Sequence, residues 1–313
     1  MQKVKIFSGS SNKPLAEQLC AELGVPLGQV DITRLQSGEI HLAYQESLRN
    51  YHVFIVQSLS HPVNENLVEL LVMIDAAKRA SAKTINIVMP YYGYARQERK
   101  SAPREPISAK LVADVLTTVG ANRIIAVDLH ADAIQGFFQI PVDHLTALDI
   151  ITDYLKNKKI QNPVVVSPDA GRASMAEKLA DYLDCPFAIM IKNRPAHNQT
   201  EITHIIGEVE GMTPIIIEDL IDTGGTIVNV VEALKKRGAN DAYIAATHGL
   251  FSQNALEKLN HPSIREVVIT DTIALPDEHP DKFIVLPMAC LLGNAIRIIN
   301  NGGSIDHLFK HIT

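Results

Sequence analysis

The sequence predicts an α/β fold built from two domains. Short apolar runs rich in Val and Ile alternate along the chain with segments whose apolar residues recur at helical spacing. Such alternation is typical of parallel sheets with helical crossovers. The 313 residues suit two domains of about 150 residues better than one core. We therefore expect two domains, each with a mainly parallel central sheet flanked by helices.

The expected strands are apolar runs of four to six residues, and the expected helices carry one apolar stripe each. In the helix predicted over Asn64–Ala80, for example, Leu67, Leu70 and Ile74 share one face. The predicted strands are Val4–Phe7, Val53–Val56, Ile85–Met89, Ile124–Val127, Val164–Val166, Ala188–Ile191, Ile215–Ile217, Ala242–Ala246 and Val267–Thr270. The other predicted helices are Ser108–Val119, Arg172–Leu183 and Ile227–Arg237.

We interpret the segment 138–146 as the end of the first unit, because no flexible Gly/Ser linker marks a boundary elsewhere. The expected domains are residues 1–145 and 146–303. The tail 304–313 is expected to pack back on the first domain.

Composition excludes several classes of protein. A net charge of −6 argues against general nucleic-acid binding. The three cysteines show no paired spacing, so disulfides and zinc ribbons are not expected. The sequence contains neither a signal peptide nor an apolar run of membrane-spanning length. We expect a cytoplasmic protein without a membrane partner.

The most informative segment runs from Pro214 to Thr226. An apolar strand ends in Glu218 and Asp219, a loop with two glycines and two threonines follows, and a helical pattern begins. Such a loop directs successive N–H groups and a helix N-terminus at one phosphate. The carboxylates repel that phosphate but suit the hydroxyls of an attached sugar, or a metal ion. The chemistry is that of a sugar-phosphate site, and the alternative is an ordinary acidic turn.

Known nucleotide-binding loops are missing from the sequence. It contains no Gly-x-x-x-x-Gly-Lys-[Ser/Thr] motif, and no Gly-x-Gly-x-x-Gly motif follows a strand. A dinucleotide enzyme is therefore not expected, and any nucleotide must be held differently.

Unusual polar residues follow several other predicted strands, where α/β folds bind ligands. Arg96, Gln97, Arg99, Lys100 and Arg104 lie in a basic segment after Ile85–Met89, beside tyrosines that suit a nucleotide base. The alternative interpretation is a solvated basic loop.

Three further predicted strands are also followed by polar residues that suit a ligand. His130 suits a metal or a nucleotide phosphate, and a structural histidine is an equal alternative. Asp169 suits Mg²⁺, or a helix N-cap. Lys192 and Arg194 are expected on a mobile loop that neutralises a polyphosphate; an exposed basic hairpin is the alternative. Glu39 suits an adenine or a ribose.

Together these motifs resemble the ribose-phosphate pyrophosphokinase (PRPP synthase) family, class I type, in the same order and over essentially the whole chain. The motifs are Tyr94–Lys100, Asp128–His130, Ser167–Asp169, Lys192-x-Arg194 and Asp222–Thr226. The resemblance implies two type I phosphoribosyltransferase-like domains. It also implies transfer of the β,γ-diphosphoryl group of Mg-ATP to the C1 hydroxyl of ribose 5-phosphate. A homo-oligomer, hexameric or dimer-based, is implied as well.

Carried over residue by residue, the resemblance implies these roles. ATP is bound by Ser37, Gly38, Glu39, Arg96, Gln97, Arg99 and His130. Ribose 5-phosphate is bound by Arg194, Glu218, Asp219, Asp222, Thr223, Gly224, Gly225 and Thr226. The catalytic residues are Lys192 and Arg194, and Mg²⁺ is held by His130 and Asp169.

Three departures from the family pattern change the expectations. Leu35 replaces an aromatic residue that stacks on adenine, so nucleotide affinity or base selectivity is expected to differ. The pattern Ser-Pro-Asp-x-Gly-Gly-x-x-Arg is read as shortened by two residues in the segment Ser167–Arg172, which alters its expected diphosphate contacts. Glu218 stands where Asp is commoner.

Two other functions stay open. A phosphoribosyltransferase that consumes 5-phosphoribosyl 1-diphosphate explains Glu218–Thr226 but leaves Arg96, Gln97 and the first domain without a role. A non-catalytic regulatory homologue is the other alternative, favoured by the altered segments at Leu35–Ser37 and Ala170–Arg172.

Overall fold

The computed structural model describes residues 3–196 and 199–308, with only the backbone described for 192–196, 199–203 and 307. The described chain divides into two compact units. The first unit contains residues 3–146, 272–274 and 287–308. The second contains Ala147–Asp271 and Leu275–Leu286, apart from residues 197–198.

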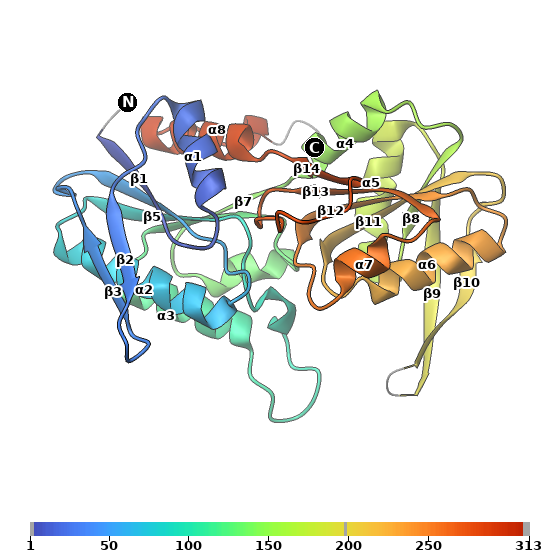
Figure 1. Ribbon diagram of the computed structural model, residues 1–313, viewed down its shortest axis with the longest axis horizontal. Helices are drawn as coiled ribbons and strands as arrows, with labels where there is room; N and C mark the ends of the chain where they lie inside the picture. The colour runs from blue at the N-terminus through green and yellow to red at the C-terminus, as the bar shows by residue number, and fades with distance from the viewer. Residues whose placement is uncertain (1–2, 197–198, 309–313) are drawn as a thin grey trace. The chain divides into compact units, whose positions relative to one another are not determined.

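The first unit is built on a parallel five-stranded sheet in the order β1-β4-β5-β6-β7. Helices α1 and α8 cover one face of this sheet and α2 and α3 the other (Figure 1). The strands are β1 (Val4–Ser8), β4 (His52–Val56), β5 (Thr84–Met89), β6 (Arg123–Val127) and β7 (Val142–Leu145). The helices are α1 (Lys13–Leu23), α2 (Val63–Arg79), α3 (Ser108–Val119) and α8 (Ala289–Asn301), with short 3₁₀ turns η1 (Ala95–Gln97), η2 (Asp132–Phe137) and η4 (Asp306–Leu308).

A separate antiparallel hairpin of β2 (Val30–Arg34) and β3 (Ile40–Tyr44) packs against α2. The Tyr44 hydroxyl donates a hydrogen bond to the Met73 carbonyl at 3.0 Å, and its ring meets Phe7 edge-on at 4.6 Å. The base of the hairpin is thus anchored to the core of the first unit.

The second unit contains a seven-stranded sheet in the order β10-β9-β8-β11-β12-β13-β14, parallel except for the antiparallel β9–β10 pair. Its strands are β8 (Pro163–Ser167), β9 (Phe187–Ala196), β10 (Gln199–Ile206), β11 (Thr213–Ile221), β12 (Ala242–Gly249), β13 (Ile264–Thr270) and β14 (Phe283–Leu286). Its helices are α4 (Leu148–Asn157), α5 (Ala173–Leu183), α6 (Gly225–Lys236) and α7 (Ala255–Leu259), with the 3₁₀ turn η3 (Ala170–Arg172).

The central strands are continuous apolar runs because helices cover both faces of their sheets. Ile215, Ile216 and Ile217 of β11 are at most 1% exposed, and β11 lies between β8 and β12. Burying such a side chain stabilises the fold by about 1.5–3 kcal/mol. The α/β class and every predicted strand are therefore confirmed, because hydrophobic burial dictates both.

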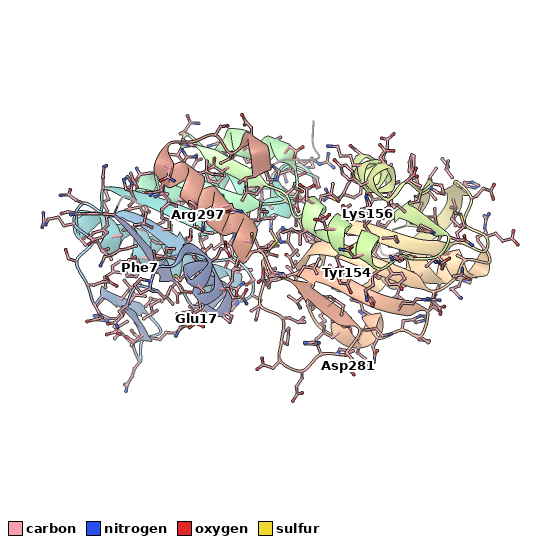
Figure 2. The ribbon with its side chains drawn as sticks, turned by 90° about the horizontal axis from the view of Figure 1, so that it is seen from above. Phe7, Glu17, Tyr154, Lys156, Asp281 and Arg297 are labelled. Carbon is pink, nitrogen blue, oxygen red and sulfur yellow. The ribbon has the colours of Figure 1, made fainter. Side chains whose placement is uncertain are left out.

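The C-terminal segment lies elsewhere than expected. We expected residues 146–303 to form the second domain, but residues 287–303 belong to the first unit. Helix α8 packs along α1, and Arg297 donates a hydrogen bond to the Glu22 carbonyl at 3.1 Å (Figure 2). Gly293 permits this close approach, since a Cβ there would lie 2.8 Å from Glu22 Cγ. Residues 304–308 continue from α8 in the same unit, and residues 309–313 lie outside the described residues.

Two segments in which no strand was predicted contain strands. The segment read as the end of the first unit contains β7, whose central Asp143 and His144 obscure its apolar pattern. The backbone of residues 192–196, expected in a mobile loop, continues β9 and pairs with β10. None of the helices in the described residues combines the length and the apolarity needed to span a membrane.

Candidate active site

The β11–α6 loop, residues 222–226, follows the central strand of the second unit. Glu218 and Asp219 lie within β11, slightly earlier relative to the strand end than expected. Gly224 has φ +72° and caps α6, which begins at Gly225. Gly224 is needed here for two reasons. Its φ is left-handed, and a Cβ would lie 3.2 Å from Leu259 Cγ.

Two backbone carbonyl groups of this loop accept hydrogen bonds from the segment that follows β12. The Ser252 N–H donates to the Asp222 carbonyl at 3.0 Å, and Lys258 Nζ donates to the Thr223 carbonyl at 3.3 Å. The first N–H groups of α6 have no acceptor within their own helix, as in every α-helix. A helix N-terminus of this kind stabilises an anion through these donors and its dipole.

The acidic pair in β11 contacts an arginine that sequence reasoning did not assign to it. Arg172 Nη2 lies 2.6 Å from Asp219 Oδ2, and Arg172 Nε lies 3.9 Å from Glu218 Oε2. The topology explains the contact, because β8 and β11 are parallel neighbours and Arg172 follows β8. The only local signal was a basic residue after a predicted strand.

Asp169 is held by its own turn after β8. Its Oδ1 accepts a hydrogen bond from the Gly171 N–H at 3.0 Å, and the Ser167 hydroxyl donates to its carbonyl at 2.6 Å. This is the N-cap geometry that the sequence left open as an alternative. A carboxylate has acceptor sites on both oxygens, so capping through Oδ1 does not by itself exclude binding of a hydrated ion.

Lys192 and Arg194 belong to the second unit through the backbone of β9. Their side chains lie outside the described part of the chain. Their predicted catalytic role therefore stays a prediction.

In the first unit, the β2–β3 turn, residues 35–39, carries the first group of residues predicted to bind ATP. The turn is closed by hydrogen bonds from the Leu35 N–H to the Glu39 carbonyl at 2.9 Å and from the Gly38 N–H to the Leu35 carbonyl at 2.8 Å. The Ser37 hydroxyl donates to Glu39 Oε2 at 2.7 Å. Leu35 is 49% exposed, so an apolar side chain stands in solvent at the position of the missing aromatic ring.

The second group of predicted ATP residues lies in and after η1, which follows β5. Arg96 and Gln97 are both exposed. The Ser108 hydroxyl donates to Gln97 Oε1 at 2.6 Å, which fixes the amide orientation against the start of α3. Arg99 pairs with Glu98 at 3.5 Å and is exposed.

The segment Asp128–His130 follows β6 and is positioned by His144, which sequence reasoning missed. The Leu129 N–H donates to His144 Nε2 at 2.8 Å, so this nitrogen carries no proton. Burial lowers the pKa of His144, against the opposing effect of Asp128 and Asp132. The neutral ring thus fixes the backbone next to His130.

The predicted Mg²⁺ ligands fall in different units, His130 in the first and Asp169 in the second. Within the described residues no three His, Cys, Asp or Glu side chains form a cluster that could hold a metal ion.

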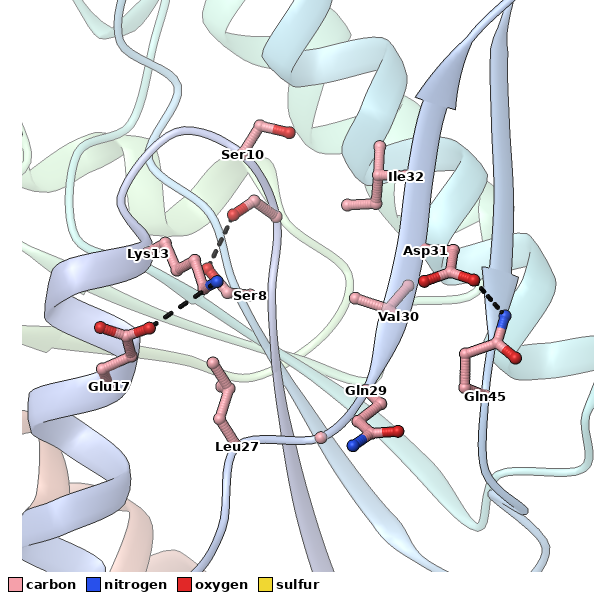
Figure 3. A pocket seen from close by; sticks show the side chains of 12 residues that line it. Ser8, Ser10, Lys13, Glu17, Leu27, Gln29, Val30, Asp31, Ile32 and Gln45 are labelled. Carbon is pink, nitrogen blue, oxygen red and sulfur yellow. Dashed lines mark hydrogen bonds and ion pairs between the residues drawn. The ribbon is translucent and has the colours of Figure 1, made fainter.

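The first unit also contains a cavity of about 500 Å³ (Figure 3). It lies between the start of α1 and strand β2, and it includes the exposed Lys13–Glu17 pair at 3.8 Å. None of the residues predicted to bind ATP lines it.

Known proteins resemble this chain along nearly its entire length. A family model described as the N-terminal domain of ribose phosphate pyrophosphokinase matches residues 4–120. A second, described as the phosphoribosyl synthetase-associated domain, matches residues 187–310. The ribose-phosphate pyrophosphokinase of Fusobacterium nucleatum is 52% identical over 310 residues, covering 98% of each chain. The chain belongs to the ribose-phosphate pyrophosphokinase family.

Other members of the ribose-phosphate pyrophosphokinase family agree. The Bacillus cereus protein of that name is 50% identical over 308 residues, or 98% of this chain and 97% of its own. The crystal structure of phosphoribosylpyrophosphate synthetase from Mycobacterium smegmatis has a TM-score of 0.91 at 43% identity. The match covers 96% of this chain and 100% of that chain. The predicted family and its α/β fold are confirmed. Most of the first unit matches the N-terminal domain of this family, which the alternative of a lone phosphoribosyltransferase leaves unexplained.

Proposed function

We propose that this enzyme transfers the β,γ-diphosphoryl group of ATP to the C1 hydroxyl of ribose 5-phosphate, forming 5-phosphoribosyl 1-diphosphate and AMP. Membership of the ribose-phosphate pyrophosphokinase family supports the reaction. The single structural observation that carries the proposal is the β11–α6 loop, which joins an anion-binding helix N-terminus to an acidic pair.

In this proposal, ribose 5-phosphate binds to the second unit. The N–H groups of Gly225 and Thr226, with the hydroxyls of Thr223 and Thr226, bind the 5-phosphate. Glu218 and Asp219 accept hydrogen bonds from the ribose hydroxyls, and Arg194 adds a positive charge. The N-cap conformation of Gly224 supports this assignment, since α6 begins directly after it and the first N–H groups of a helix have no acceptor within that helix.

ATP binds to residues of the first unit. We assign Ser37, Gly38 and Glu39 to the adenosine, and Arg96, Gln97, Arg99 and His130 to ATP as well, with the arginines toward its phosphates. Exposed guanidinium groups suit phosphate oxygens, because they offer paired donors in a rigid plane.

Mg²⁺ supplies charge neutralisation on the triphosphate when bound. We assign His130 and Asp169 to contacts with the ion or its waters. Both keep the required chemistry, an imidazole nitrogen and a carboxylate oxygen. Excess EDTA should therefore abolish turnover, and full activity in EDTA would overturn this part of the proposal.

Lys192 and Arg194 act on the transferring group. Diphosphoryl transfer needs alignment and charge stabilisation more than covalent participation by the protein. Two cations near the β- and γ-phosphates would favour the transition state over the ground state.

We further propose a cytoplasmic location and a homo-oligomer, hexameric or dimer-based. Sedimentation velocity tests the oligomeric state.

One assay separates the proposal from its alternatives. The purified chain is incubated with Mg-ATP and ribose 5-phosphate without any nucleobase, and AMP and 5-phosphoribosyl 1-diphosphate are measured. Equal amounts of both products are expected. A phosphoribosyltransferase would form neither without a base. A non-catalytic homologue would bind the substrates, detected by calorimetry, without forming product.

A further inference from the structure

The acidic pair of β11 shares one guanidinium. Arg172 lies 2.6 Å from Asp219 and 3.9 Å from Glu218, and the three side chains are only 19%, 5% and 14% exposed, respectively. Consecutive strand residues point to opposite faces of a sheet, so a group that reaches both carboxylates must lie at the edge of β11, beyond Ile216, where the pairing with β8 ends. Two carboxylates with so little exposure to solvent repel each other, and a nearby positive charge offsets that repulsion.

The position of Arg172 in the chain suggests how this contact arose. Residues Ser167–Gly171 match the first five positions of the family pattern Ser-Pro-Asp-x-Gly-Gly-x-x-Arg. When the segment is compared with the pattern without the two-residue shortening assumed in the sequence analysis, Arg172 stands at the second glycine and Met175 at the arginine. Helix α5 begins at Ala173, with Arg172 as its N-cap, so the two positions lie about one helical turn apart. Residues three apart share a helix face.

We propose that Arg172 is a positioning residue that replaces the arginine of the family pattern from one turn earlier in the chain. It holds the carboxyl groups of Glu218 and Asp219 in one orientation, in which they accept hydrogen bonds from the ribose hydroxyls. A guanidinium has donors in a fork wide enough for two carboxylates, and a carboxylate has more acceptor sites than one guanidinium contact uses. This inference rests on the proposed ribose 5-phosphate site.

The first test removes the guanidinium. In Arg172→Gly, the KM for ribose 5-phosphate should rise about tenfold or more, the usual effect of losing a charged hydrogen bond. The KM for ATP should stay within about twofold, because ATP is assigned to other residues. Arg172→Lys keeps the charge without the fork, so its KM for ribose 5-phosphate should lie between those of the wild type and Arg172→Gly.

The second test moves the guanidinium to the position of the family arginine. The double variant Arg172→Gly/Met175→Arg should recover most of the affinity for ribose 5-phosphate. The matched control is Arg172→Gly/Ser174→Arg, which adds the same charge two residues from position 172 on a different, exposed helix face. It should not recover affinity. A purely structural role for Arg172 would not distinguish these two variants.

Direct binding makes the result independent of turnover. Calorimetry with ribose 5-phosphate alone, on variants whose thermal unfolding shows that they are folded, should reproduce the order of the KM values. Unchanged affinity in Arg172→Gly, or equal recovery at positions 174 and 175, would overturn the inference while leaving the synthase activity in place. If the wild type forms no 5-phosphoribosyl 1-diphosphate, the proposed function fails, and the binding series still decides the role of Arg172.

Discussion

The β11–α6 loop and the β2–β3 turn are both assigned to ligands, but the protein holds them differently. The loop is tied to its surroundings through backbone carbonyls bound by Ser252 and Lys258, and Gly224 packs close to Leu259. The turn is closed by hydrogen bonds among its own residues, and a Cβ at Gly38 would meet no atom within 4 Å. Tertiary contacts constrain the first, whereas local bonds suffice for the second.

The two segments therefore illustrate two ways in which a protein can bind a ligand. In the proposed ribose 5-phosphate site the backbone of the β11–α6 loop is the ligand-binding group, so a change there should disturb binding and stability together. In the proposed ATP site the exposed side chains of the β2–β3 turn bind the ligand, so a change there should alter affinity with little effect on stability. The predictions that follow test this separation.

The largest effect is expected at Lys192, which belongs to neither segment. In Lys192→Ala, kcat should fall about 100-fold or more, because the lost interaction acts mainly in the transition state. The dissociation constant for ribose 5-phosphate should change by less than about threefold, since the β11–α6 loop is intact. Steady-state kinetics and calorimetry give the two values. The control Lys236→Ala, at the exposed end of α6, should match the wild type. Equal losses in turnover and binding would contradict the assignment.

Gly224→Ala should affect binding and stability together. The substitution forces a left-handed alanine against Leu259, which costs about 1–3 kcal/mol and shifts the amides that bind phosphate. The KM for ribose 5-phosphate should rise about tenfold, as when a charged hydrogen bond is lost. Urea unfolding and kinetics measure both effects.

Gly211→Ala is the matched control for this change. Gly211 has φ +69°, close to that of Gly224, but a Cβ there meets nothing within 4 Å. Stability should fall by about 1–2 kcal/mol from backbone strain alone, and the KM for ribose 5-phosphate should stay unchanged. If both variants bind ribose 5-phosphate normally, the loop is not the phosphate site.

The contrast also explains what the sequence predicts well. The β11–α6 loop was predicted because its signals are contiguous: an apolar strand, two carboxylates, glycines and threonines. The roles of its residues stay predictions until ligands are bound. Central strands such as β11 were equally plain, because burial on both faces leaves an uninterrupted apolar run.

Other features depend on residues far apart in the sequence. The pair Arg172–Asp219 requires β8 and β11 to be neighbours, which no local pattern reveals. Strand β7 was missed because Asp143 and His144 occupy its centre, and Asp143 is paired with Arg123 at 2.6 Å. Helix α8 reads as an amphipathic helix of either domain, and only its packing on α1 assigns it to the first unit.

Leu35→Phe tests the side-chain mode of the β2–β3 turn. An aromatic ring at this exposed position should stack on adenine and lower the KM for ATP about fivefold or more, since base stacking contributes about 1–3 kcal/mol. The free energy of unfolding should stay within about 0.5 kcal/mol, because the side chain is exposed. Kinetics with ATP as the varied substrate measure the effect.

The control for this change is Leu111→Phe on α3, where the leucine is 59% exposed and has no assigned role. It should leave the KM for ATP unchanged. If Leu35→Phe instead lowers stability and leaves ATP binding unaltered, the turn behaves as a structural element and the contrast with the β11–α6 loop fails.

The smallest effect concerns His144, which fixes the backbone beside His130 much as Ser252 fixes the β11–α6 loop. Burial lowers the pKa of His144 below its ordinary value of about 6.5. The unfolded chain therefore binds a proton at this residue more readily than the folded chain. Stability is fully present above about pH 6.5 and declines as the pH falls toward the lowered pKa of the folded state.

His144→Gln removes the titrating group while keeping an acceptor for the Leu129 N–H. Its free energy of unfolding, measured by urea denaturation between about pH 5 and 8, the range in which histidine titrates, should decline less steeply toward acid than that of the wild type. Parallel profiles would mean that His144 does not titrate differently on folding. The hydrogen bond from the Leu129 N–H to His144 would then hold the Asp128–His130 segment without a pH-dependent contribution to stability.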